Sequence, residues 1–93
     1  MSAQVIETGK AVNITDTAVI SASNCQLLGF YVNSTSSGAI VIRRGGASGT
    51  VISGTITPAI GFHRFPANCA SGCHVTKASG TIDATFFVVE GAA

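Results

Sequence analysis

The fold is decided by a stretch near the C-terminal end of the chain, Thr81-Ile-Asp-Ala-Thr-Phe-Phe-Val-Val-Glu90. Successive side chains of a strand point to opposite faces. This places Ile82, Ala84, Phe86 and Val88 on one face, and Asp83, Thr85, Phe87 and Val89 on the other. Apolar residues on both faces predict burial on both sides, one of them against a partner sheet or another chain.

Similar short runs, rich in Val, Ile and Thr and closed by Gly, Ser or Pro, precede this stretch. They span residues 11–14, 18–21, 27–34, 39–43, 50–57, 60–65 and 74–77, with turns expected at 34–38 and 78–80. About eight short strands with turn residues between them predict an all-β fold, a small antiparallel β-sandwich of jelly-roll-like type. We expect one domain over residues 1–93, in which residues 1–10 form an N-terminal arm or an edge strand.

The composition indicates a protein that covers part of its surface with other chains. Of the 93 residues, 46% are hydrophobic and only 10% are charged, whereas about 25% is usual. Large apolar patches are uncommon on monomers, so we expect a homo-oligomer or a component of a larger shell. A net charge of +1 gives no electrostatic basis for binding nucleic acid or an anionic membrane.

The N-terminal residues have neither the basic nor the apolar region of a signal peptide. In addition, no apolar run approaches the length that a membrane span needs. The sequence therefore predicts a soluble protein made in a cytoplasm.

Residues that could carry catalysis or bind a metal are few. Cys69, Cys73 and His74 form a loose cluster, with Cys25 and His63 elsewhere in the chain. Structural zinc sites use two tight pairs of ligands, and the second pair is missing here. Reduced cysteines acting as small apolar residues are the favoured interpretation. The chain also lacks the Gly-x-Ser-x-Gly motif of a nucleophile elbow, so we expect no enzyme, no metal and no cofactor.

Five residues are the candidates for a subunit or capsid interface. Phe62, Arg64 and Phe65 follow one another on one expected strand, and aromatic residues and arginine are enriched at interfaces. Arg43 and Arg44 precede a glycine-rich loop. They are too few to bind nucleic acid, and a polar turn with solvated arginines is the favoured interpretation. If they have a function, we expect them to pair with acidic groups of a neighbouring subunit.

Over about two thirds of its length, from Leu28 to Glu90, the chain resembles the small β-sandwich virion proteins that decorate or cement the capsids of tailed bacteriophages. The resemblance lies in turn glycines, prolines and alternating strands. It is carried by Leu28-Gly-Phe-Tyr-Val32, Ser37-Gly38 before Ala39-Ile-Val-Ile42, Gly45-Gly-Ala-Ser-Gly49, Ile56-Thr-Pro-Ala-Ile-Gly61, Phe65-Pro66, Gly72-Cys-His-Val-Thr76 and Gly80-Thr-Ile-Asp-Ala-Thr85.

This resemblance implies a jelly-roll-like homotrimer that sits on the outer surface of the virion capsid and contacts the major capsid protein. Such a protein would be synthesised in the host cytoplasm. Cys69 and Cys73 are not part of the family pattern. Two alternatives stay open: a tail, baseplate or head-fibre module of the virion, and a carbohydrate-binding module. Sugar sites favour exposed aromatic residues, and the chain has no Trp and a single Tyr, Tyr31.

Overall fold

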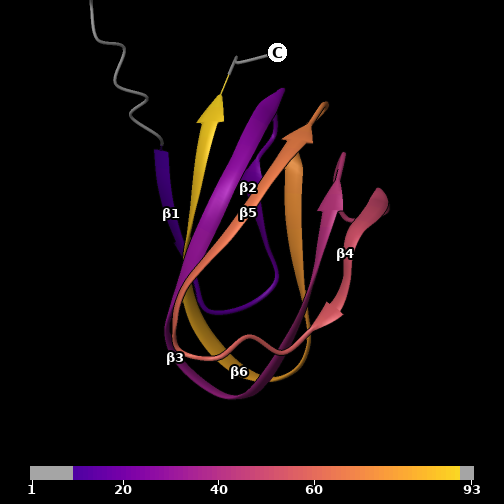
Figure 1. The fold of residues 1–93 in the computed structure, drawn as a ribbon. Coiled ribbons are helices and arrows are strands. Elements are labelled where there is room, and N and C mark those ends of the chain that lie inside the picture. Colours follow the sequence, from indigo (N-terminus) through magenta and orange to yellow (C-terminus); the bar gives the residue numbers. More distant parts are fainter. Residues whose placement is uncertain (1–9, 91–93) are drawn as a thin grey trace, which may run out of the picture.

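The computed structural model describes residues 10–90 as an all-β protein (Figure 1). The strands are β1 (Lys10–Ile14), β2 (Ala18–Ser21), β3 (Cys25–Arg44), β4 (Thr50–Ile56), β5 (Gly61–Cys69) and β6 (Cys73–Glu90). They form one six-stranded sheet in which every pairing is antiparallel. This confirms the predicted all-β, antiparallel class. Within residues 10–90 there is no helix able to span a membrane. The arm or edge strand expected over residues 1–10 lies outside the described residues, apart from Lys10 at the start of β1.

Two strands are much longer than the sequence pattern suggested. β3 joins the expected strands 27–34 and 39–43, and β6 joins 74–77 and 81–90. The chain therefore does not reverse direction at 34–38 or 78–80, although turns were predicted there. The structure has six strands, whereas about eight were predicted. The physical reason is that β3 and β6 pair with each other through these segments, from Cys25 opposite Glu90 to Arg44 opposite Cys73.

The residues of the expected turns bend the two strands. Ser37 and Gly80 have positive φ angles of 54° and 70°, and the register of β3 against β6 shifts on both sides of Ser37. Bulges of this kind leave a residue unpaired and increase the local bend and twist. Gly38 allows the close approach of the two strands, because a Cβ atom there would lie 2.5 Å from the carbonyl oxygen of Thr81.

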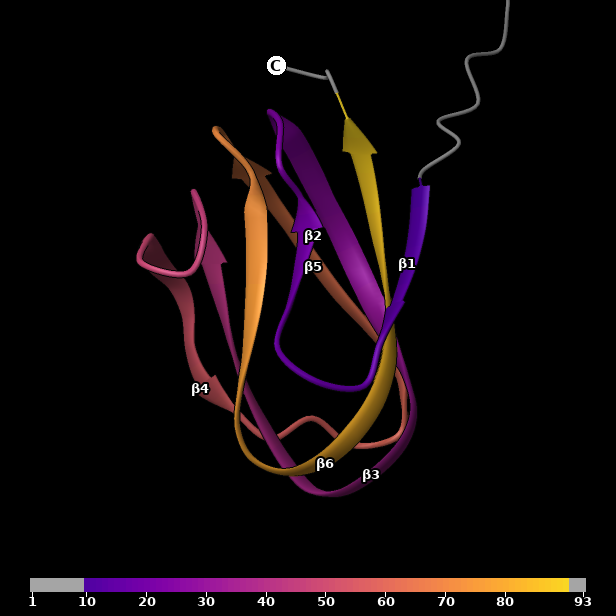
Figure 2. The same ribbon diagram turned by 180° about the vertical axis from the view of Figure 1, so that it is seen from behind.

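The bends divide the sheet into two halves, which fold toward each other in Figures 1 and 2. In the first half the strand order is β1, residues 84–90 of β6, residues 25–32 of β3, and β5. In the second half it is β2, residues 73–77 of β6, residues 39–44 of β3, and β4. Each half therefore contains one part of each long strand at its centre.

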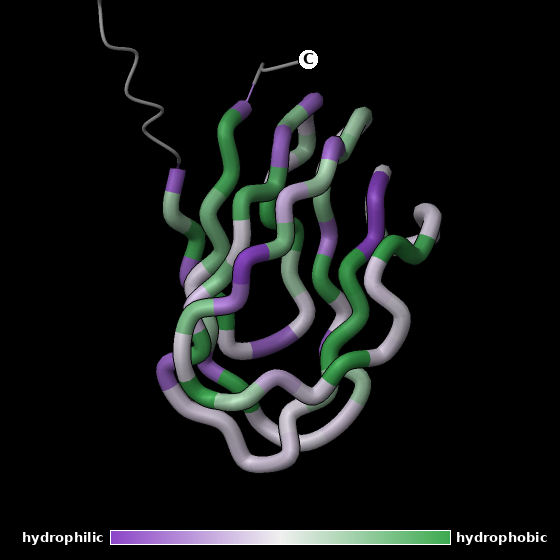
Figure 3. Tube along the Cα trace, in the orientation of Figure 1, coloured by the Kyte–Doolittle hydropathy of each residue, from purple (hydrophilic) through white to green (hydrophobic). Residues whose placement is uncertain are grey.

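The hydrophobic core is formed by the side chains that point into the fold. In Figure 3 the hydrophobic residues lie mainly along the strands, interrupted by polar ones. Phe30 and Phe86 are its largest members, stacked with ring centroids 4.9 Å apart. Of the two faces of residues 81–90 predicted to be buried, one is buried within the chain: Ile82, Ala84, Phe86 and Val88 are at most 4% exposed. The other face, with Asp83, Thr85, Phe87 and Val89, is only partly buried. Both halves contribute, since Val32 of the first half and Ile42 of the second are fully buried in the same cluster.

Candidate interaction surface

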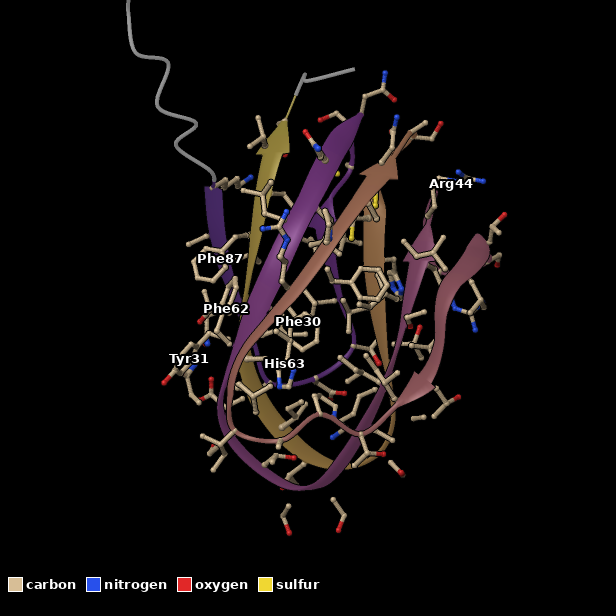
Figure 4. The ribbon with its side chains drawn as sticks, in the orientation of Figure 1. Phe30, Tyr31, Arg44, Phe62, His63 and Phe87 are labelled. Carbon is tan, nitrogen blue, oxygen red and sulfur yellow. The ribbon has the colours of Figure 1, made fainter. Side chains whose placement is uncertain are left out.

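The outward side of the first half carries three aromatic residues from three strands, and we call this surface the aromatic face. Tyr31 is paired in register with Phe62 on one side and with Thr85 on the other. Partners in register point to the same face of a sheet, and Phe87 lies two residues beyond Thr85 on that face. Figure 4 shows Phe87, Phe62 and Tyr31 following one another along one side of the molecule.

A glycine brings two of these rings together. Gly29 lies between Phe87 of β6 and Arg64 of β5 in the register, and a Cβ atom on Gly29 would lie 3.1 Å from the end of the Phe62 ring. The ring of Phe62 therefore lies over the backbone of β3 and reaches Phe87, with centroids 6.3 Å apart. Even so, Phe62 is 57% exposed and Tyr31 43% exposed.

A group of polar side chains borders the aromatic residues. Asp83 Oδ1 accepts hydrogen bonds from the amide nitrogens of Asn13, at 2.8 Å, and Asn33, at 3.2 Å. Both amides also lie within hydrogen-bond distance of the Thr85 hydroxyl. Strands β1, β6 and β3 are thus connected through side chains, and the carboxylate of Asp83 is held in a fixed orientation.

The structure separates the five interface candidates. Phe62 and Arg64 alternate outward along β5 and belong to the aromatic face. Phe65 points the other way and packs against the core. The prediction that Phe65 lies at an interface therefore finds no support in its position, because its parity on β5 is opposite to that of Phe62 and Arg64. His63 also points inward, and its ring stacks on that of Phe30 with the two centroids 5.1 Å apart.

The other two candidates lie on the second half of the sheet. Arg44 is exposed and stands far from the labelled aromatic residues in Figure 4. Arg43 is partly buried, and its guanidinium donates a hydrogen bond to the carbonyl oxygen of Gly49 at 3.3 Å. Arg43 is paired in register with His74. Burial, and then the positive charge of Arg43, lower the pKa of His74.

Two hollows adjoin β5. One, of about 320 Å³, is on the aromatic face and is lined by Gln26, Leu28, Phe62, Arg64 and Pro66. The other, of about 430 Å³, lies between β5 and the end of β4, and it is lined by Phe30, Ile56, Thr57, Pro58, His63, Arg64 and Phe65. The second hollow is mainly apolar, and the His63 ring that borders it already has its Nε2 atom 2.7 Å from the carbonyl oxygen of Ala59.

The three cysteines meet inside the fold, whereas the sequence pattern placed Cys25 apart from Cys69 and Cys73. Cys25 is paired in register with Cys69, and its thiol lies 3.8 Å from the carbonyl oxygen of Cys69. All three are buried as free thiols. Burial, followed by the proximity of Cys69, raises the pKa of Cys25 and of Cys73. In residues 10–90 no three His, Cys, Asp or Glu side chains are arranged to hold a metal ion.

Tyr31, Phe87 and Asp83 were not among the predicted interface residues. Their alternation along the sequence shows which residues share a face of one strand, but only the register brings residues of different strands together. Comparisons with protein-family models, curated proteins and solved structures give no match for this chain.

Proposed function

We propose that this chain is a non-enzymatic structural protein of a tailed-phage virion, a decoration or cement subunit of the capsid. In this proposal it forms a homotrimer, binds the major capsid protein on the outer shell, and stabilises the contacts between capsomers. The observation that carries the proposal is the aromatic face. Phe62 and Tyr31 are 57% and 43% exposed on a chain in which only 10% of the residues are charged. A surface of this kind is typical of an interface.

We further propose that the bent sheet is a jelly-roll sandwich, and the pairings support this. Counted in chain order, the paired segments number eight when the two parts of β3 and of β6 are counted separately. The first half then has the order 1-8-3-6 and the second half 2-7-4-5. Segments 1 and 8, 2 and 7, 3 and 6, and 4 and 5 are each paired. This is the pattern of one long antiparallel hairpin rolled up into two sheets, as in the jelly roll.

The proposed mechanism is mechanical. A shell under internal pressure fails at the contacts between its capsomers, and a subunit bound across such a contact must be broken before the capsomers can separate. Each copy would gain burial of apolar surface that it cannot achieve alone, since small domains bury a limited share of their surface. The shell would gain additional contacts between neighbours.

A second function is favoured by one observation, the combination of exposed rings with fixed amide and carboxylate groups. Tyr31 and Phe62 lie on the same face as the hydrogen-bonded group of Asn13, Asn33 and Asp83. Sugar-binding sites combine the same elements, so a carbohydrate-binding module is the alternative from a different class. A tail, baseplate or head-fibre module would use the aromatic face in the same way as a decoration protein.

The first experiment is to measure the molar mass of the purified chain by light scattering coupled to size exclusion. A stable particle of three times the 9.3 kDa chain mass is expected. The trimer is then added to expanded capsids that lack it, and their resistance to heat and to osmotic shock is measured. Phe62→Ser should abolish the gain in resistance. Val19→Ser is the matched control, because Val19 is 56% exposed but lies on β2 in the second half. Capsids whose resistance does not change on addition of the wild-type protein contradict the proposal.

A further inference from the structure

Two charged side chains of the aromatic face have no oppositely charged partner among the described residues. The ion pairs within residues 10–90 are Lys10 with Glu90, at 3.6 Å, and Lys77 with Asp16, at 3.7 Å. Neither pair involves Arg64 of β5 or Asp83 of β6. Each of these two side chains is therefore available for an ion pair with another molecule.

The two charges lie at opposite corners of the same surface. Arg64 is paired with Gly29, and Asp83 with Ser34, so they differ in height along β3 and lie on opposite sides of it. The rings of Tyr31 and Phe62 occupy the space between the two corners. The aromatic face thus has a positive corner, an apolar centre and a negative corner.

Asp83 is oriented for an additional contact. The amides of Asn13 and Asn33 both donate to its Oδ1 atom, and no hydrogen bond within residues 10–90 uses Oδ2. A carboxylate that is already held by two donors loses little side-chain freedom when a guanidinium binds its second oxygen.

The positive corner adjoins the hollow of about 320 Å³ whose walls include Leu28, Phe62 and Arg64. This hollow is open to an apolar side chain from outside. The exposed ring of Tyr31 and this hollow, whose walls combine apolar Leu28, Phe62 and Pro66 with polar Gln26 and Arg64, lie on the same face and can meet between two copies.

We propose that a second copy of this chain covers the aromatic face, with Arg64 of one copy paired to Asp83 of the other. This inference rests on the self-association in the proposed function and identifies its contact. Unlike charges meet in this arrangement, whereas other registers bring like charges together or leave a charge buried without a partner, which is strongly unfavourable. In a two-fold pair the two aromatic faces meet and both Arg64–Asp83 contacts form between the same two copies. In a cyclic three-fold assembly the contact is head-to-tail, so the Arg64 corner of each copy meets the Asp83 corner of the next.

A charge exchange tests the pairing. Arg64→Glu and Asp83→Arg are made separately and together, and the association constant of each variant is measured by light scattering at low salt. Each single reversal should weaken association by at least about 30-fold, and the double reversal should restore it to within about 3-fold of the wild type. Asp16→Arg is the control with the same charge change as Asp83→Arg. Asp16 lies between β1 and β2 with its side chain 72% exposed, away from the aromatic face, and the substitution should leave association unchanged.

Asp83→Arg also removes the carboxylate that Asn13 and Asn33 bind, so circular dichroism must show that the variant is folded. If it is not, the neutral variants Asp83→Asn and Arg64→Gln replace the reversals. In a double-mutant cycle they should then show a coupling of at least about 5-fold. Single variants that associate like the wild type overturn the proposal, as does a double reversal that is no tighter than the single ones.

A wild-type chain that stays monomeric at every concentration also overturns the proposal. If in that case the fluorescence intensity of Tyr31, the single tyrosine of the chain, changes when oligosaccharides are added, the aromatic face is a carbohydrate-binding surface. These measurements need no capsid. A chain that associates through this pair but leaves capsids unprotected therefore disproves the virion role and not the contact.

Discussion

Phe86 and Phe87 are adjacent in β6 and point to opposite sides of the sheet, so truncating each to alanine compares the core with the aromatic face. Phe86 is 0% exposed and stacks on Phe30. Phe87 is half-buried, and its ring is tilted against that of Phe62, with the two centroids 6.3 Å apart. The two substitutions remove the same atoms from the same strand, and only the surroundings differ.

The expected magnitudes follow from these surroundings. Replacing a fully buried Phe by Ala removes its transfer free energy and leaves a cavity, at a cost of about 3–5 kcal/mol. In a domain of this size, about 1 kcal/mol corresponds to about 4–8 °C. Phe86→Ala should therefore lower the Tm by about 12–40 °C. Phe87→Ala leaves no closed cavity and should cost about 1 kcal/mol.

Thermal and urea unfolding followed by circular dichroism measure both effects. The protein must be dilute enough to be monomeric, because association stabilises the folded chain and would add to the loss caused by Phe87→Ala. At higher concentration Phe87→Ala should weaken association, whereas Phe86→Ala should leave association intact where the variant is folded. Equal losses of stability in the two variants, or a loss below about 1 kcal/mol for Phe86→Ala, would refute the assignment of the core.

Four further predictions concern the backbone at Gly29, the reactivity and ionisation of the thiols, and the buried His74. Gly29→Ala should cost about 1–3 kcal/mol in urea unfolding, because its Cβ would lie 2.5 Å from the carbonyl oxygen of His63; an unchanged midpoint would contradict this. The three thiols should react with Ellman's reagent at least about 100-fold more slowly in the native than in the unfolded chain, and one fast native thiol would disprove their burial. Since burial raises the pKa of Cys73, the unfolded chain ionises first, and stability should fall as the pH rises above about 8.5. Burial and the charge of Arg43 lower the pKa of His74. As the pH falls through about 6.5, His74 is therefore protonated in the unfolded chain before it is protonated in the folded one, and the free energy of unfolding should decrease. His74→Gln should remove this decrease, and identical stability–pH curves for the variant and the wild type would contradict the prediction.

The parts of the fold that could be predicted are those encoded within one strand. The alternation in residues 81–90 predicted which residues share a face of β6, because neighbouring side chains of a strand point to opposite sides. It predicted burial of both faces, and only one is buried within the chain. The sequence also predicted where the backbone changes direction, in the segments that contain Ser37 and Gly80. It did not predict that these segments bend a continuous strand and do not reverse the chain, since a residue with positive φ is compatible with both. The pairing of β3 with β6 decides between these outcomes, and it joins residues far apart in the sequence.

The same limit applies to the candidate surface. Phe62 and Arg64 were predicted to act together because they share a face of β5, and the structure places both on the aromatic face. Phe65 was included for its residue type, although its parity is opposite. Tyr31 and Asp83 join the surface only through register with other strands. Cys25 likewise meets Cys69 through register, although the two lie 44 residues apart in the sequence.

The division between core and surface bears on how the proposed subunit would assemble. The large buried side chains, Phe30 and Phe86 among them, pack within one chain, so the core of each copy is built from its own residues. Phe62 is held over Gly29 by its contact with Phe87, and its exposed part is already fixed before a second copy arrives. A preordered surface loses less conformational entropy on binding than a flexible one. The aromatic face, with Arg64 and Asp83 at its corners, is ordered within one chain in this way, so a copy that joins a shell already built would bind without first ordering its contact residues.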